Sequence, residues 1–116
     1  IRGRMDAVVP SPGPRVIDYK YASWREGDEA GYEVQMTAYS LALMKALRTD
    51  TAIAELWYLK PPIKVIRREY DRTEAEQRLA DLLKKYSAAL ETDVWPMAAR
   101  TYCDGVECGF RPRCWV

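Results

Sequence analysis

The sequence predicts an α/β domain with a mixed central β-sheet flanked by helices. Short segments rich in β-branched and aromatic residues alternate with two long segments of helical composition. Their order is strand, strand, helix, strand, strand, helix, followed by an irregular tail that carries the cysteines. The 116 residues are 48% apolar and 30% charged, a balance typical of globular proteins. We expect a single domain over residues 1–116, with a core of 1–91 and a tail of 92–116.

The first two strands are expected to form a hairpin. Residues 3–9 alternate in side-chain character, residues 15–21 contain the β-branched pair Val16 and Ile17, and residues 10–14 (PSPGP) have the composition of a turn. Two short strands joined by such a turn favour antiparallel pairing. We expect Asp6 near the middle of the first strand, close to Asp18 across the pair on one face.

A loop and a helix are expected next. Residues 24–31 are polar and contain glycine, which favours a loop. Residues 32–47 are rich in Ala, Leu and Met and contain no Gly or Pro, which favours a helix packed on the sheet and buried on more than one side. Its expected apolar stripe comprises Val34, Ala38, Leu41 and Ala42, widened by Met36, Leu43, Met44 and Leu47.

The second half of the core is predicted as two strands and a helix. Residues 52–59 are apolar enough for a central strand, whereas residues 63–70 carry the charges of an exposed edge. Thr73 and Glu76 form a candidate capping box for a helix that extends to about residue 91. Its expected buried stripe comprises Ala75, Leu79, Leu82, Leu83, Tyr86, Ala89 and Leu90.

Composition excludes several classes of chemistry. The chain has no histidine, which rules out Ser-His and Cys-His catalysis and His-ligated zinc within it. No run of 18 apolar residues is present, so we expect no membrane span. The net charge is +1, so a nucleic-acid surface must be a local patch.

Basic and aromatic side chains supply candidates for such a patch. Two readings are open: the basic residues follow phosphates along a groove, or they are the solvated charges of an edge strand. Trp24, in the loop after Lys20, is a candidate for stacking on bases, whereas Trp57 is expected in the core. The candidate basic residues are Arg2, Arg4, Lys60, Lys64, Arg67 and Arg68.

The most informative stretch is Val16-Ile17-Asp18-Tyr19-Lys20. Side chains alternate along a strand, so Asp18 and Lys20 share a face. With Asp6 on the neighbouring strand, two carboxylates are available for Mg²⁺, which prefers oxygen ligands, and Lys20 is available to orient a water or to stabilise a phosphodiester transition state. The alternative is a weak surface ion pair between Asp18 and Lys20.

All three cysteines, Cys103, Cys108 and Cys114, lie within the last fourteen residues. An odd number at one end of the chain does not suggest a disulfide framework. The pattern is closer to a thiolate metal site that lacks one ligand. One disulfide with a free thiol, or three inert thiols, are the alternatives.

Taken in order, these motifs resemble those of a known family. Gly3-Arg4-Met5-Asp6, then Asp18-Tyr19-Lys20, then Gln35-x-x-x-Tyr39 are similar to the RecB-type branch of the PD-(D/E)XK nuclease superfamily. The cysteine tail resembles the iron–sulfur end of AddB-like and CRISPR-associated RecB-like nucleases. The resemblance implies a restriction-endonuclease-like core and a Mg²⁺- or Mn²⁺-dependent DNA nuclease, most simply an exonuclease.

The resemblance also implies a role for each matching residue. Asp6 and Asp18 resemble the family's metal-binding acids, with the backbone carbonyl of Tyr19 as a further ligand, and Lys20 resembles its catalytic lysine. Gln35 and Tyr39 resemble a motif that supports the site and contacts the DNA, beside Arg4. They lie four residues apart and so share a helix face.

For the tail, the resemblance implies a [4Fe–4S] cluster that takes three thiolates here and a fourth upstream of Ile1. The sequence departs from the pattern because four residues, not two, separate Cys103 from Cys108. Another metal, a disulfide or no ligation therefore stay open. On this reading the chain is an N-terminally truncated fragment that also lacks one metal ligand.

Three functions remain in competition. The first is a cytoplasmic nuclease of bacterial, archaeal or phage origin that acts on DNA with a fused or associated helicase or CRISPR protein. The second is a catalytically incomplete nuclease-fold module with a DNA-binding or structural role. The third is a small thiolate-metal domain in which Asp18 and Lys20 are incidental.

Overall fold

A computed structural model describes residues 2–95, 100–105, 108–109 and 111–114. The chain divides into two compact units, Ile1–Leu82 and Leu83–Val116. The first unit contains the whole β-sheet and the first long helix, and the functional residues expected outside the cysteine tail lie within it.

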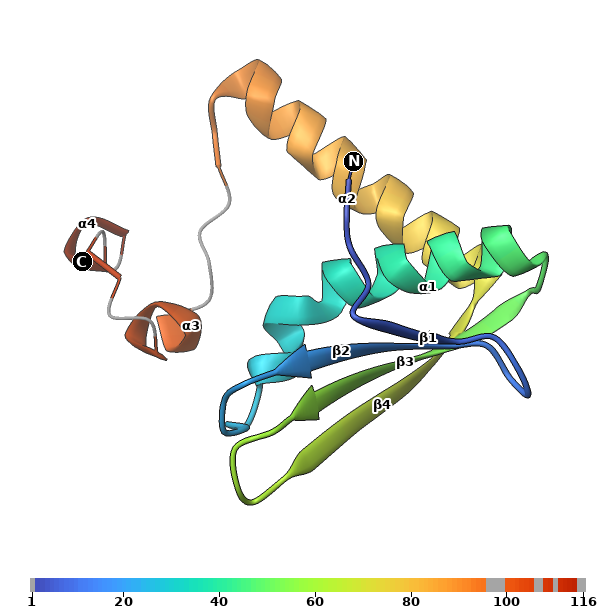
Figure 1. Ribbon diagram of the computed structural model, residues 1–116. Helices are drawn as coiled ribbons and strands as arrows, with labels where there is room; N and C mark the ends of the chain where they lie inside the picture. The colour runs from blue at the N-terminus through green and yellow to red at the C-terminus, as the bar shows by residue number, and fades with distance from the viewer. Residues whose placement is uncertain (1, 96–99, 106–107, 110, 115–116) are drawn as a thin grey trace. The chain divides into compact units, whose positions relative to one another are not determined.

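The sheet of the first unit has four strands in the order β1-β2-β3-β4 (Figure 1). The pairs β1–β2 and β3–β4 are antiparallel, whereas β2 and β3 run parallel. A parallel pair needs a crossover connection, and the helix α1 (Glu33–Leu47) provides it. The predicted α/β class with a mixed sheet is therefore confirmed. The strands are β1 (Ala7–Val9), β2 (Arg15–Lys20), β3 (Thr51–Tyr58) and β4 (Lys64–Asp71).

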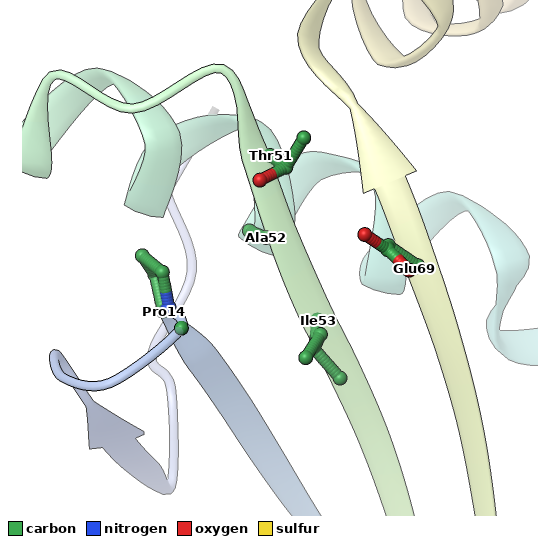
Figure 2. A pocket seen from close by; sticks show the side chains of 6 residues that line it. Pro14, Thr51, Ala52, Ile53 and Glu69 are labelled. Atoms are coloured by element: carbon green, nitrogen blue, oxygen red, sulfur yellow. The ribbon is translucent and has the colours of Figure 1, made fainter.

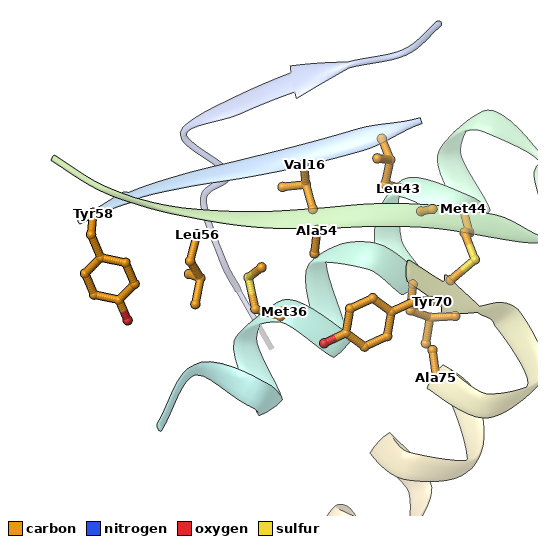
Figure 3. Packing of buried hydrophobic residues seen from close by; sticks show 11 residues of the cluster. Val16, Met36, Leu43, Met44, Ala54, Leu56, Tyr58, Tyr70 and Ala75 are labelled. Atoms are coloured by element: carbon orange, nitrogen blue, oxygen red, sulfur yellow. The ribbon is translucent and has the colours of Figure 1, made fainter. Parts of the chain in front are cut away.

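Strand β3 lies between β2 and β4, as its apolar composition predicts. Its even-numbered side chains face α1 and form the centre of the core (Figure 3). Strand β4 lies at the edge of the sheet, as its charges predict. The buried cluster comprises Val16, Met36, Leu41, Leu43, Met44, Ala52, Ala54, Leu56, Tyr58, Tyr70 and Ala75.

Helix α1 packs on the sheet through a face that differs from the predicted stripe. Val34 and Leu47 are exposed, whereas Thr37 and Ser40 are buried. The helix is apolar on nearly every side, so its composition does not single out one face. The two small hydroxyl side chains lie on the buried face, and Thr37 satisfies its own hydroxyl by donating to the carbonyl of Glu33 at 2.8 Å.

Three further expectations are corrected. Strand β1 begins at Ala7 rather than at residue 3. The predicted loop 24–31 contains the 3-10 helix η1 (Asp28–Tyr32), which follows Gly27 at φ 86°. The N–H of Arg25 donates to Asp28 Oδ2 at 2.9 Å and tightens that turn. The tail forms two helices too short to produce a periodic sequence, α3 (Arg100–Gly105) and α4 (Arg111–Cys114).

Helix α2 (Arg72–Thr92) follows β4 without a loop, and this changes its cap. Asp71 Oδ1 accepts a hydrogen bond from the N–H of Glu74 at 3.1 Å, so Asp71 caps the helix instead of Thr73. The predicted stripe is buried at Ala75 and Ala89 but exposed at Leu83, Tyr86 and Leu90. The first unit ends at Leu82, so the helix beyond it does not belong to the core of the sheet.

Four charged side chains connect α1, β4 and α2 within the first unit. The carboxylate of Glu33 accepts hydrogen bonds from Arg68, at 2.7 Å, and from Arg78. Glu74 forms ion pairs with Arg78 at 2.7 Å and Arg68 at 3.8 Å. Two acids and two arginines balance, so the network fixes the start of α1 without leaving a net charge.

The observed cap yields a test. Replacing Asp71 with Ala leaves the N–H of Glu74 without its acceptor, and we expect a loss of about 1 kcal/mol in the free energy of unfolding. Thr73→Ala is the matched control and should change it by less than about 0.5 kcal/mol. Urea denaturation of the two variants measures both values. A larger loss at Thr73 than at Asp71 would restore the capping box predicted from the sequence.

Candidate active site

Asp18 and Lys20 point from the last residues of β2 toward α1, on the side of the sheet that carries the core. Asp18 is 4% exposed, and Lys20 Nζ lies 2.6 Å from its Oδ2. This contact is an ion pair without the alignment of a hydrogen bond, and within the described chain Oδ2 has no hydrogen-bond donor. A buried carboxylate oxygen that is held by one ammonium group and by no hydrogen-bond donor can exchange that partner for a metal cation.

Gln35 and Tyr39 extend this arrangement along one face of α1. Gln35 Nε2 donates to Asp18 Oδ1 at 3.2 Å and to the Tyr39 hydroxyl at 3.1 Å. The Tyr39 hydroxyl in turn donates to the backbone carbonyl of Arg4 at 2.7 Å. The structure thus brings together the predicted Gln35, Tyr39 and Arg4, although Arg4 takes part through its backbone.

Gly3 allows the N-terminal segment to lie against this helix. A Cβ atom at Gly3 would stand 2.8 Å from Cε1 of the Tyr39 ring, which is closer than real contacts of this kind. A side chain at residue 3 would therefore push the Tyr39 ring aside, and the glycine leaves room for the hydrogen bond from Tyr39 to Arg4. This contact accounts for the glycine at the start of the motif Gly3-Arg4-Met5-Asp6.

Asp6 lies one residue before β1, and not in the middle of a strand as predicted. Its Oδ2 accepts a hydrogen bond from the N–H of Tyr19 at 2.9 Å. If β1 were longer, a backbone carbonyl of that strand would accept this hydrogen bond instead. The pairing of Ala7 with Ile17 places Asp6 opposite Asp18. The C=O of a strand residue points to the same neighbour as its N–H, so the carbonyl of Tyr19 faces the side of Asp6.

Two tyrosines that the sequence analysis did not select complete the site. Lys20 Nζ lies 4.0 Å from the centre of the Tyr32 ring, a distance typical of cation–π contacts. Tyr58 is the register partner of Lys20 on β3. Tyr32 precedes Gln35 by three residues, so extending the Gln35–Tyr39 face back by one turn would have found it.

Both buried tyrosines of the core resist ionisation. Burial raises the pKa of Tyr58 to about 12, and the negative charges of Asp28, Glu29 and Asp18 act in the same direction. Its hydroxyl has no hydrogen-bond partner within the described chain. Burial, followed by the carboxylate of Glu33, likewise raises the pKa of Tyr70. Tyr58 therefore stays neutral beside Lys20 across the range in which enzymes work.

The oxygen atoms of the site fit a divalent cation. Asp6 and Asp18 provide two carboxylates on adjacent segments, and Asp18 Oδ2 is a buried acceptor without a donor. Across the described ranges no three His, Cys, Asp or Glu side chains gather into a metal-binding group. Mg²⁺ is commonly held by one or two carboxylates and keeps several waters, so two acids and the Tyr19 carbonyl are an appropriate set.

Four of the six basic candidates divide into two groups. Arg67 forms an ion pair with Glu55 at 3.6 Å on the face of the sheet away from α1, and Arg68 is held by Glu33. Lys60 and Lys64 instead lie over aromatic rings. Arg67 and Arg68 are therefore paired with acids of the fold, contrary to the interpretation that they follow phosphates along a groove. Lys60 and Lys64 remain candidates for that role.

The two tryptophans are placed differently from the prediction. Trp24 packs against the buried cluster, and its Nε1 donates to Glu29 at 3.1 Å. Trp57, expected in the core, lies on the opposite face of the sheet, where its Nε1 donates to Glu55 at 2.9 Å and its ring meets that of Tyr19. The period of two along β3 explains this, because Leu56 and Tyr58 face the core.

The cysteines do not form the expected cluster in the described part of the tail. Cys103, Cys108 and Cys114 are free thiols, buried, half-buried and exposed respectively. The N–H of Cys108 donates to the carbonyl of Cys103 at 3.0 Å, so backbone rather than sulfur joins them. As placed, these thiols do not fit a [4Fe–4S] cluster, and its presence stays a prediction.

A small hollow in the surface lies at the other end of the sheet (Figure 2). Thr51, Ile53 and Glu69 line it together with Pro14. The register sets these residues at the start of β3, whereas Lys20 pairs with Tyr58 at its end. The hollow is therefore separate from the candidate active site. Its lining includes one carboxylate, that of Glu69, and no basic side chain.

The fold and the site together define a class of protein. A buried acid and a lysine two residues apart at the end of a strand, with a second acid on the adjacent segment, are groups that can hold a divalent cation beside a phosphodiester. The model of the PD-(D/E)XK nuclease superfamily matches residues 1–115, and the chain belongs to that superfamily. No curated protein and no solved structure gives a significant match. Among the described helices, none is long and apolar enough to cross a membrane.

The buried hydroxyl of Tyr58 yields a prediction. Replacing Tyr58 with Phe removes a polar group without a partner, and we expect a gain of about 1 kcal/mol in the free energy of unfolding near pH 8. The unfolded chain loses the Tyr58 proton near pH 10, and the folded chain only near 12, so stability falls as pH rises between these values. Urea titrations at pH 8 and pH 11 should show a smaller loss in Tyr58→Phe.

Tyr86→Phe is the control for this comparison, because Tyr86 is exposed. It should keep the pH dependence of the unmodified chain. Equal losses between pH 8 and pH 11 in Tyr58→Phe and in the unmodified chain would contradict the assignment.

Proposed function

We propose that the chain is a Mg²⁺- or Mn²⁺-dependent deoxyribonuclease domain of the RecB type that hydrolyses phosphodiester bonds as an exonuclease. The observation that carries the proposal is Asp18, a buried acid that is paired with Lys20 through Oδ2 and lies opposite Asp6. Membership of the PD-(D/E)XK superfamily supports the reaction class. The pathway we favour is DNA repair or recombination, or the processing of phage or CRISPR DNA, in the cytoplasm with an associated helicase or CRISPR protein.

Each residue of the site has a role in this proposal. Asp6, Asp18 and the Tyr19 carbonyl would hold the cation, which when bound activates a water and neutralises charge on the phosphate. Gln35 holds the carboxylate of Asp18 in place through Oδ1, so the cation would bind at Oδ2, which Lys20 contacts in the structure. Lys20 lies beside Asp18, so a phosphate bound at the cation would also lie near the Lys20 ammonium. That ammonium would stabilise negative charge in the transition state.

One observation favours a second candidate. Within the part of the chain that the structure describes, the site offers two carboxylates, and Lys20 already neutralises one of them. A nuclease-fold module that binds DNA or supports a partner, with incomplete chemistry, is consistent with this set. The two candidates differ in whether the residues bind a divalent cation, and this can be measured without any assay of cleavage.

Replacing Asp18 with Asn tests the reaction. The variant keeps the volume of the side chain and removes the charge that would hold the cation, so we expect metal-dependent cleavage of DNA to fall by at least about a hundredfold. Release of labelled nucleotides from DNA in Mn²⁺ measures the rate. Asp81→Asn removes an equal charge from the exposed surface of α2 and should leave the rate unchanged. Undiminished cleavage by Asp18→Asn would refute the proposed mechanism.

Thermal unfolding tests the binding of the cation. A ligand that binds only the folded state raises the melting temperature, and a hundredfold excess over Kd contributes about 2.7 kcal/mol. We expect millimolar Mn²⁺ to raise the melting temperature of the unmodified chain and of Asp81→Asn, each compared with itself in EDTA. Asp18→Asn should lose the rise. No rise in the unmodified chain would favour the incomplete module.

A further inference from the structure

Tyr21 and Trp24 lie beside Lys60 and Lys64, at the end of the sheet where β2 and β3 finish. Two backbone hydrogen bonds continue the pairing past the strands, from Leu59 N–H to the carbonyl of Lys20 at 2.9 Å and from Lys60 N–H to the carbonyl of Ala22 at 3.2 Å. Figure 1 shows the turn after β2 and the connection from β3 to β4 at the same end. This aromatic and basic patch therefore begins one residue after Lys20.

Each lysine of the patch lies over an aromatic ring. Lys60 Nζ is 5.2 Å from the centre of the Tyr21 ring, and Lys64 Nζ is 4.9 Å from that of Trp24. No carboxylate in the described chain forms an ion pair with either lysine, unlike the neighbouring arginines of β4. The two ammonium groups thus keep their charge available to an anion in solution.

The rings differ in what they offer to a ligand. Tyr21 is 81% exposed, which is unusual for a side chain with so large an apolar area. Trp24 is half-buried against the core and tied to Glu29, so it serves as a fixed support for Lys64. Ile63, 66% exposed in the connection from β3 to β4, adds a further apolar surface.

This combination matches the chemistry of unpaired nucleotides. Bases of a single strand present open faces that stack on aromatic rings, while their phosphates are met by lysines. In a duplex the bases stack on one another, so an exposed ring has little to bind. An ordinary solvated loop would explain the lysines, but not an exposed tyrosine and isoleucine beside them.

We propose that Tyr21, Trp24, Lys60 and Lys64 form a subsite for single-stranded DNA, in which Tyr21 stacks on a base and the lysines bind phosphates next to Lys20. The subsite rests on the proposed function, because it takes DNA to be the substrate. It makes an unpaired strand, rather than an intact duplex, the form of DNA that reaches Asp18.

Fluorescence anisotropy with labelled oligothymidylate and a duplex of the same length tests the subsite in EDTA, where no cleavage occurs. We expect Tyr21→Ala to weaken binding of oligothymidylate about tenfold, the equivalent of one lost stacking contact, and to leave duplex binding unchanged. Tyr21→Phe keeps the ring and should bind normally. Lys60→Ala should lower the slope of log K against log salt by about 0.7.

Lys85→Ala removes an exposed charge from α2 and is the control; its binding should match that of the unmodified chain. Three results overturn the subsite: no binding of oligothymidylate by the unmodified chain, normal binding by Tyr21→Ala, or an equal loss for the duplex. Its failure is distinct from that of the nuclease. Cleavage that needs Asp18, together with normal binding by Tyr21→Ala, refutes only the subsite; Tyr21-dependent binding without cleavage in any metal refutes only the nuclease.

Discussion

The carboxylate of Asp18, buried at the end of β2, is the constraint to which the rest of the site responds. An isolated buried charge is costly, and it persists only where other groups compensate for the lost water. Lys20 supplies the opposite charge from the same strand, and Gln35 supplies a hydrogen bond from α1. The kind of compensation is informative, because Oδ2 is held by an ion pair with Lys20 rather than by a hydrogen bond, and a metal cation can take the same position.

Gln35 reaches Asp18 because β2 and β3 are parallel. Antiparallel neighbours would allow a tight turn, whereas the parallel pair requires α1 to cross the sheet between them. The start of the helix is thereby set over the end of β2, and the ion pairs of Glu33 with Arg68 and Arg78 fix it there. The same topology brings the segment after Lys20 against the end of β3, where the basic and aromatic patch forms.

Local periodicity predicted the parts of the site that depend on one element. The alternation of a strand places Asp18 with Lys20, and the turn of a helix places Gln35 with Tyr39, and both pairs are in contact as expected. The errors arise where two elements decide the outcome. Strand β1 is shorter than its alternation suggests because the side chain of Asp6 takes the N–H of Tyr19 from the backbone ladder. The cap of α2 moved to Asp71 because the helix begins directly at the end of β4.

Charge shows the same division between local and tertiary information. Along β4 and the connection before it, composition presents Lys60, Lys64, Arg67 and Arg68 as equivalent cations. In the fold, an acid on β3 holds Arg67 and an acid on α1 holds Arg68, through contacts between residues distant in sequence. Lys60 and Lys64 lie over aromatic rings instead. A cation over a ring stays attractive to phosphate, whereas a cation bound to a carboxylate is largely neutralised. The region of the surface at which a nucleic-acid strand would bind is therefore decided by which cations the fold leaves without an acid.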